Sequence, residues 1–145
     1  MSHNVQVEII HPNEWQRLRV IRLKSLSVNP EAFGGTYEIE SAEDESAWRV
    51  KFEKLDFLIA SIDGIDAAVM SVEKLDGDFG ATCWIGGCWS DPAYRGKGLL
   101  RAMMNFVDEQ DKGWQVQGLG VWIDNYSAIA AYENLGFVKM GEDTP

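Results

Sequence analysis

The stretch WSDPAYRGKGLL, residues 89–100, governs the interpretation of the sequence because it joins a predicted strand to a predicted amphipathic helix. The first amides of a helix have no partner within it, and together with the helix dipole they form a site for anions. Gly96 and Gly98 let the backbone approach a ligand without a side chain in the way, and Arg95 and Lys97 add positive charge. The junction therefore predicts a phosphate or pyrophosphate held mainly by backbone N–H groups.

Two common nucleotide-binding motifs do not fit this junction. The phosphate-binding loop G-x-x-x-x-G-K-[ST] has no match in the sequence. The dinucleotide motif G-x-G-x-x-G begins with Gly96 and Gly98 but meets Arg101 at its third glycine, and the predicted strand order before it is wrong for a first βαβ unit. These two classes of nucleotide-binding protein are therefore excluded.

Outward from the junction, apolar periodicity predicts five strands and four helices. Asn13 and Asn125 are expected to be N-caps, Gly136 should end the last helix, and residues 31–40 should form a loop or short helix. The order predicts a single α/β domain over residues 1–145 with a largely antiparallel first half. The strands are expected at residues 5–10, 55–62, 65–74, 81–90 and 116–123, and the helices at residues 13–27, 43–54, 99–112 and 125–135.

The fourth predicted strand contains two adjacent glycines, Gly86 and Gly87. Glycine inside a strand marks a bulge or a close ligand approach, or it is a packing kink. Cys83 and Cys88 lie five residues apart in this strand, so their side chains are expected on opposite faces unless a bulge intervenes. Both thiols are expected to be reduced, and with two histidines in addition the sequence predicts no metal site.

The net charge of the chain limits the classes of partner that it is expected to bind. The chain has 145 residues, with 13 Lys and Arg against 23 Asp and Glu, which gives a net charge of −10. A protein this acidic repels phosphate backbones and anionic membrane surfaces, so neither nucleic acid nor a membrane is expected as a partner. The first residues show no basic segment followed by an apolar run, so a cytoplasmic location is expected.

Three segments together resemble the GNAT superfamily of acyl-CoA-dependent N-acyltransferases. Residues 91–98 (DPAYRGKG) are similar to the family's D-P-x-Y and [R/Q]-x-x-G-x-[G/A] pattern, and residues 125–137 (NYSAIAAYENLGF) to its N-x-x-A-x-x-x-Y-E-x-L-G-F helix. The N-terminal half, with PEAFGGTYE at residues 30–38 and Trp48, resembles one bacterial branch. The resemblance implies a mixed, mostly antiparallel central sheet flanked by helices, with a splay between the fourth and fifth strands.

The resemblance also implies a site for acetyl-CoA as cosubstrate, without a metal. Backbone groups of Cys88, Trp89 and Ser90 would pair with the pantetheine arm, and one N–H there would stabilise the oxyanion. Tyr132 is the candidate acid for the leaving thiolate, although a core tyrosine is an equal alternative. The remaining cofactor contacts would come from Arg95, Gly96, Lys97, Gly98, Leu99, Leu100 and Asn125, and the acceptor contacts from Phe33, Tyr37 and Glu38.

The sequence departs from the family pattern in three places. Leu100 stands where the family prefers Gly or Ala, which alters one backbone approach to the pyrophosphate. Residues 81–89 contain no carboxylate where many members carry a basic Glu, which leaves Glu38, Glu40 or a water chain as the candidate base. The sequence ends at Pro145, so the last strand is expected to be short or absent, and a homodimer could complete the acceptor side.

These features predict an enzyme that acetylates a primary amine, in a small molecule or a peptide, by direct transfer from acetyl-CoA. One alternative is a sensor or regulator of the same fold that binds acyl-CoA without catalysis. A second is a structural protein that retains only the fold. The identity of the acceptor amine does not follow from the sequence.

Overall fold

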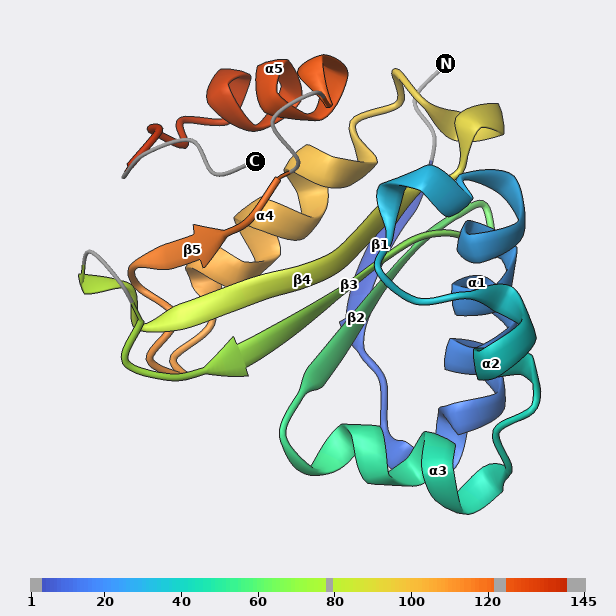
Figure 1. Ribbon diagram of the computed structural model, residues 1–145. Helices are drawn as coiled ribbons and strands as arrows, with labels where there is room; N and C mark the ends of the chain where they lie inside the picture. The colour runs from blue at the N-terminus through green and yellow to red at the C-terminus, as the bar shows by residue number, and fades with distance from the viewer. Residues whose placement is uncertain (1–3, 78–79, 122–124, 141–145) are drawn as a thin grey trace.

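A five-stranded mixed sheet in the order β1-β2-β3-β4-β5 forms the centre of the computed structural model, which describes residues 4–77, 80–121 and 125–140 (Figure 1). The first three strand pairs are antiparallel, and β4 pairs with β5 in parallel. This arrangement confirms the predicted α/β fold with a mostly antiparallel sheet. The strands are β1 (Val5–Ile9), β2 (Asp56–Ile62), β3 (Ile65–Lys74), β4 (Cys83–Ser90) and β5 (Gln117–Leu119).

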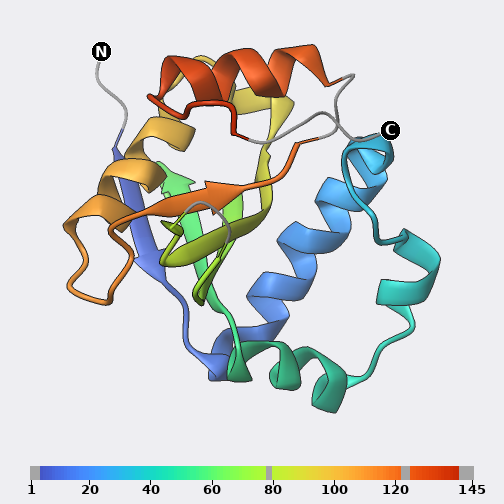
Figure 2. The ribbon, with the colours of Figure 1, turned by 60° about the vertical axis from the view of Figure 1, so that its left-hand side comes forward.

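Helices cover both faces of the sheet (Figures 1 and 2). On one face lie α1 (Trp15–Val28), α2 (Tyr37–Ser41) and α3 (Glu45–Val50), and on the other lie α4 (Leu99–Glu109) and α5 (Tyr126–Asn134). No helix among the described residues is long and apolar enough to cross a bilayer. Single 3-10 turns occur at Pro12–Glu14, Pro30–Ala32, Lys51–Glu53 and Pro92–Tyr94.

The core is divided by the sheet because successive side chains of a strand point to opposite faces. In β2, Leu58 packs into the cluster beneath α4, whereas its neighbour Ile59 packs into the cluster beneath α1. Met103 and Val107, four residues apart on α4, complete the first cluster, and Trp48 of α3 belongs to the second. These residues are fully buried, so both helix layers are fixed firmly to the sheet.

The start of the first helix differs from the prediction. His11, not Asn13, is the capping residue: its side chain accepts a hydrogen bond from the Asn13 amide at 3.2 Å. The Glu14 carboxylate accepts one from the His11 amide at 3.1 Å, which completes a capping box. Pro12 follows the cap, and one 3-10 turn precedes α1, which begins at Trp15.

The glycine pair in β4 forms a bulge. Ser71 faces Gly86 and Val69 faces Trp89, so Met70 alone lies opposite both Gly87 and Cys88. Gly87 has a φ of 53°, a left-handed conformation that favours glycine. The extra residue inverts the alternation of side chains, so that Cys83 and Cys88 both pack on the α4 side as free thiols.

The described part of β5 pairs with only the first three residues of β4, Cys83 to Ile85. Beyond this point β4 continues to Ser90, whereas Gly120 and Val121, the described residues that follow β5, form no ladder pair with it. The predicted splay between the fourth and fifth strands is therefore confirmed. The predicted fifth strand, residues 116–123, was longer, but its residues 122 and 123 lie outside the described part, and residues 135–140 after α5 form no strand.

Candidate functional site

A cleft of about 790 Å³ opens where β4 and β5 separate, between the N-terminus of α4 and the side of α5. It is lined by most of the predicted cofactor residues together with the predicted acid, namely Cys88, Trp89, Ser90, Arg95, Gly96, Gly98, Leu99, Leu100, Asn125 and Tyr132. Lys97, on the exposed side of the same loop, is not among the lining residues. The structure therefore gathers side chains from β4, α4 and α5 around one space.

The loop before α4 presents its backbone to this cleft. Gly96 and Gly98 have φ values of 81° and 78°, and a Cβ built on either would meet no atom within 4 Å. The first intrahelical bond of α4 runs from the Ala102 amide to the Gly98 carbonyl at 2.9 Å. The amides of Leu99 and Leu100 precede that bond and lie at the positive end of the helix. The geometry is suited to an anion placed at the helix N-terminus.

Asp91 anchors the start of the loop. Its carboxylate accepts a hydrogen bond from the Ala93 amide at 2.9 Å and forms an ion pair with Lys24 Nζ of α1 at 2.6 Å. Burial alone would raise the pKa of Asp91, but these two partners outweigh it and hold the pKa below its usual value. The acidic residue of the DPAY segment therefore fixes the loop to α1 and is not directed at a ligand.

Asn29, at the end of α1, provides a second anchor that the sequence did not reveal. Its Oδ1 accepts hydrogen bonds from Trp89 Nε1 at 2.9 Å and from Arg95 Nη2 at 3.4 Å. Asn29 and the adjoining Ala32 line the cleft on the α1 side. The cleft thus extends through the splay, from the α4 and α5 face to the face that carries α1.

Tyr132 of α5 lies within hydrogen-bonding reach of the Cys88 thiol across the cleft wall. Burial, followed by the proximity of Cys88, raises the pKa of the Tyr132 hydroxyl well above its usual value. Burial also raises the pKa of the Cys88 thiol to about 11, although the hydrogen bond with Tyr132 opposes this. Both groups are therefore neutral at physiological pH, and Tyr132 can act as a hydrogen-bond donor.

Comparisons with known proteins identify the family. The model of the acetyltransferase (GNAT) family matches residues 15–137. The chain belongs to the GNAT family. It is accordingly an acyl-CoA-dependent N-acetyltransferase, as the combined loop and α5 motifs predicted. A search of the curated proteins found no match.

Solved acetyltransferase structures share this fold at low sequence identity. An aminoglycoside acetyltransferase from an uncultured soil metagenomic sample is 18% identical with a TM-score of 0.75, over 98% of both chains. AAC(6')-Iy, bound to the bisubstrate analogue CoA-S-monomethyl-acetylneamine, is 16% identical with a TM-score of 0.74, over 97% of this chain and 95% of that one. A ribosomal-protein-alanine N-acetyltransferase from Brucella melitensis biovar Abortus 2308 is 13% identical with a TM-score of 0.71, over 99% and 98%.

Asn125 of this GNAT chain has a structural role and also lines the cleft. Its Oδ1 accepts a hydrogen bond from the Ala128 amide at 3.3 Å, which caps α5 as predicted. Tyr132 also combines two roles, because its ring packs against Phe137 with centroids 5.9 Å apart while its residue lines the cleft. The alternatives of core residue and site residue therefore do not exclude each other at either position.

The predicted acceptor residues Phe33, Tyr37 and Glu38 do not line the cleft. Phe33 stacks beneath the Arg22 guanidinium, 5.0 Å from its ring centroid. Tyr37 and Glu38, in the first turn of α2, are exposed. Glu40, the other candidate base, accepts two hydrogen bonds from Arg22 at 2.9 Å each, so its carboxylate is already engaged.

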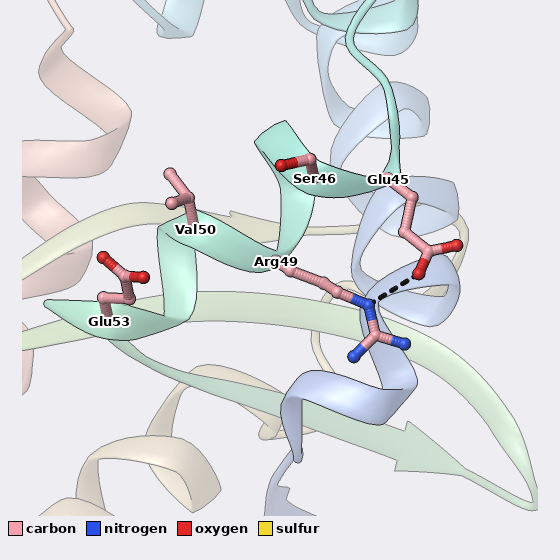
Figure 3. Close-up of a pocket in the computed structure, with 5 residues that line it drawn as sticks. All are labelled: Glu45, Ser46, Arg49, Val50 and Glu53. Atoms are coloured by element: carbon pink, nitrogen blue, oxygen red, sulfur yellow. Dashed lines mark hydrogen bonds and ion pairs between the residues drawn. The ribbon is translucent and has the colours of Figure 1, made fainter.

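A second, open hollow of about 480 Å³ lies on α3 and shares no residue with the cleft (Figure 3). In it Arg49 Nε donates to the Glu45 carboxylate at 2.8 Å, one helical turn away. Such exposed pairs stabilise a helix by only about 0.3–0.5 kcal/mol. The hollow is lined by Glu45, Ser46, Arg49, Val50 and Glu53, and among these described residues the Ser46 hydroxyl forms no hydrogen bond with a carboxylate that could activate it as a nucleophile.

Proposed function

We propose that this chain transfers the acetyl group of acetyl-CoA directly to the nitrogen of a primary amine within the cleft. The observation that carries the proposal is that the cleft connects the N-terminus of α4 with the part of β4 that the described β5 leaves unpaired. A single extended ligand with an anionic end and an amide-rich arm fits both features.

The diphosphate would lie at the loop before α4. Gly96 and Gly98, both left-handed, line the cleft together with Leu99 and Leu100, and the amides of these four residues are the proposed donors to the diphosphate. Arg95, oriented by Asn29, would neutralise part of the charge, and Lys97 would contribute from the rim of the loop. Asn125, at the mouth of α5, is placed to contact the cofactor without giving up its cap.

The pantetheine arm would follow β4 in place of a neighbouring strand. Residues 86–90 continue β4 beyond its last pair with β5, so Cys88, Trp89 and Ser90 can offer backbone groups to the arm's amides. The bulge at Gly87 lies at the head of this segment. A backbone N–H there is the proposed donor to the oxyanion that forms when the amine attacks the thioester carbon.

Tyr132 is the proposed donor to the leaving group. As the nitrogen–carbon bond forms and the carbon–sulfur bond breaks, the electron pair passes to the CoA sulfur, which Tyr132 stabilises by a hydrogen bond. The raised pKa keeps the hydroxyl protonated. The released thiolate, whose thiol form has an ordinary pKa of about 8.5, then takes up a proton from water or from the attacking amine, so the help from Tyr132 is modest but needs close placement.

A sensor that binds acyl-CoA without turnover is the second candidate. It is favoured by the lack of a carboxylate on β4, from Cys83 to Ser90, and by the engagement of Glu40 with Arg22. The acetyltransferase proposal accommodates this if water in the cleft accepts the proton of the incoming ammonium.

Steady-state release of CoA thiol from acetyl-CoA, measured with a panel of primary amines, distinguishes the candidates. The proposal predicts amine-dependent thiol release and N-acetylated product identified by mass spectrometry. Calorimetry with acetyl-CoA alone is the parallel measurement. Cofactor binding without turnover of any amine would favour the sensor, and no binding at sub-millimolar acetyl-CoA would contradict both.

A further inference from the structure

The sheet face that carries α1 holds an aromatic and an acidic side chain side by side, away from the α4 core. Glu73 of β3 and Trp84 of β4 are directly opposite each other in register, which places their Cβ atoms about 5 Å apart on one face. Trp84 is 36% exposed, an unusual degree for an indole. The Glu73 carboxylate is half-buried and forms no ion pair or hydrogen bond within residues 4–77, 80–121 and 125–140.

The Trp84 indole packs closely against two glycines. A Cβ built on Gly118 of β5 would lie 2.7 Å from two atoms of its six-membered ring, and one on Gly120 would lie 3.7 Å from it. The indole therefore packs against Gly118 of β5 and against Gly120, which follows this strand, two residues that have no side chains. No helix lies in front of this first half of β4 in Figure 1, since α1, α2 and α3 lie towards β2 and β3.

Small residues connect this position with the proposed reaction centre. The next register pair on the same face is Ser71 and Gly86, and the bulge at Gly87 follows. Arg22 Nη1 lies 3.6 Å from the position that a Cβ on Gly87 would take. The Arg22–Glu40 pair therefore lies at the Gly87 end of this strip of the sheet face, opposite to Trp84. At 3.3 Å per residue, Trp84 and Gly87 are about 10 Å apart along the strand.

We infer that Trp84 and Glu73 form a subsite for a second positive charge of the acceptor, so that the preferred substrate is a diamine or polyamine. The reactive nitrogen would lie at the Gly87 bulge, and a second ammonium would contact the indole face and the Glu73 carboxylate. The inference rests on the proposed function, because it uses the same position for the thioester. It assigns a function to the Glu73 carboxylate, which has no partner among the described residues, and to the exposed Trp84 indole.

The test compares hexamethylenediamine with n-hexylamine, which have the same chain length and differ by one terminal ammonium. The inferred subsite predicts a kcat/KM about tenfold or more higher for the diamine, lost in Glu73→Gln and reduced in Trp84→Leu. Ethylenediamine, whose nitrogens are too close to span the gap, should show no such advantage. Glu109→Gln removes one exposed carboxylate at the end of α4 and is the charge-matched control, which should keep the diamine preference.

The outcomes separate the inference from the proposed function. Calorimetry of both amines on the protein saturated with CoA gives the same comparison independently of turnover. If acetyl-CoA binds but the two amines have equal affinity and kcat/KM, or if Glu73→Gln leaves their ratio unchanged, the subsite is refuted while the acetyltransferase proposal stands. If acetyl-CoA does not bind, both are refuted. Circular dichroism of each variant verifies that it is folded.

Discussion

Replacement of Gly98 by alanine isolates the contribution of the loop before α4. Its φ of 78° is unfavourable for any residue with a Cβ, at a cost of about 1–2 kcal/mol in folding free energy. A Cβ there meets no atom within 4 Å, so the change creates no clash inside the protein. It does place a methyl group where the diphosphate is proposed to lie. The loss of one charge-assisted hydrogen bond, about 1.5–3 kcal/mol, predicts a Kd for acetyl-CoA about 10- to 100-fold weaker.

Gly64→Ala is the matched control, because Gly64 has a φ of 84° and equally open space but lies in the turn between β2 and β3. Both alanine variants should lower Tm by about 3–8 °C. Only Gly98→Ala should weaken acetyl-CoA in calorimetry, and Gly98→Trp should abolish binding with the fold intact. An unchanged Kd in the Gly98 variants, or an equal loss in Gly64→Ala, would refute the placement of the diphosphate.

Three further predictions follow from the groups around the cleft. Tyr132→Phe should lower kcat about 10- to 100-fold with little change in the Kd for acetyl-CoA, since the hydroxyl is proposed to act on the leaving sulfur; an equal kcat would exclude that role. In a Cys83→Ala background, alkylation of Cys88 by iodoacetamide should rise towards pH 11 and be slowed by acetyl-CoA, in line with a thiol pKa of about 11; a plateau near pH 8 would contradict it. Asp91→Asn should lose about 1–2 kcal/mol in urea unfolding at about pH 7; because the folded-state pKa of Asp91 is lowered, the difference from the parent should shrink as pH falls below about 4.

Local signals in the sequence were sufficient for most of the fold. The continuous apolar runs of β2 and β3 and the spaced apolar residues of α4 are each patterns within one element. The α5 cap at Asn125 and the helix stop at Gly136, with a φ of 100°, are equally local. The His11 cap was missed because the preference for Asn at helix starts outweighed a histidine followed by proline.

The contacts that organise the site join residues that are far apart in the sequence. Local sequence patterns therefore do not reveal them. Asn29 reaches Trp89 and Arg95 across 60 and 66 residues, and no local pattern around Asn29 indicates either partner. The Arg22–Glu40 pair occupies one of the candidate bases. It can be predicted only when the position of α2 relative to α1 is known. The bulge at Gly87 decided the face of Cys88, because one inserted residue inverts every side chain that follows it.

A crystal structure with acetyl-CoA bound would locate the diphosphate and the pantetheine arm in one measurement. We expect the diphosphate oxygens within hydrogen-bonding distance of the amides between Gly96 and Leu100, and the pantetheine arm beside β4 from the Gly87 bulge to Ser90. We also expect the thioester sulfur near the Tyr132 hydroxyl. Density for the diphosphate elsewhere, or an arm that leaves the splay between β4 and β5 empty, would contradict the account.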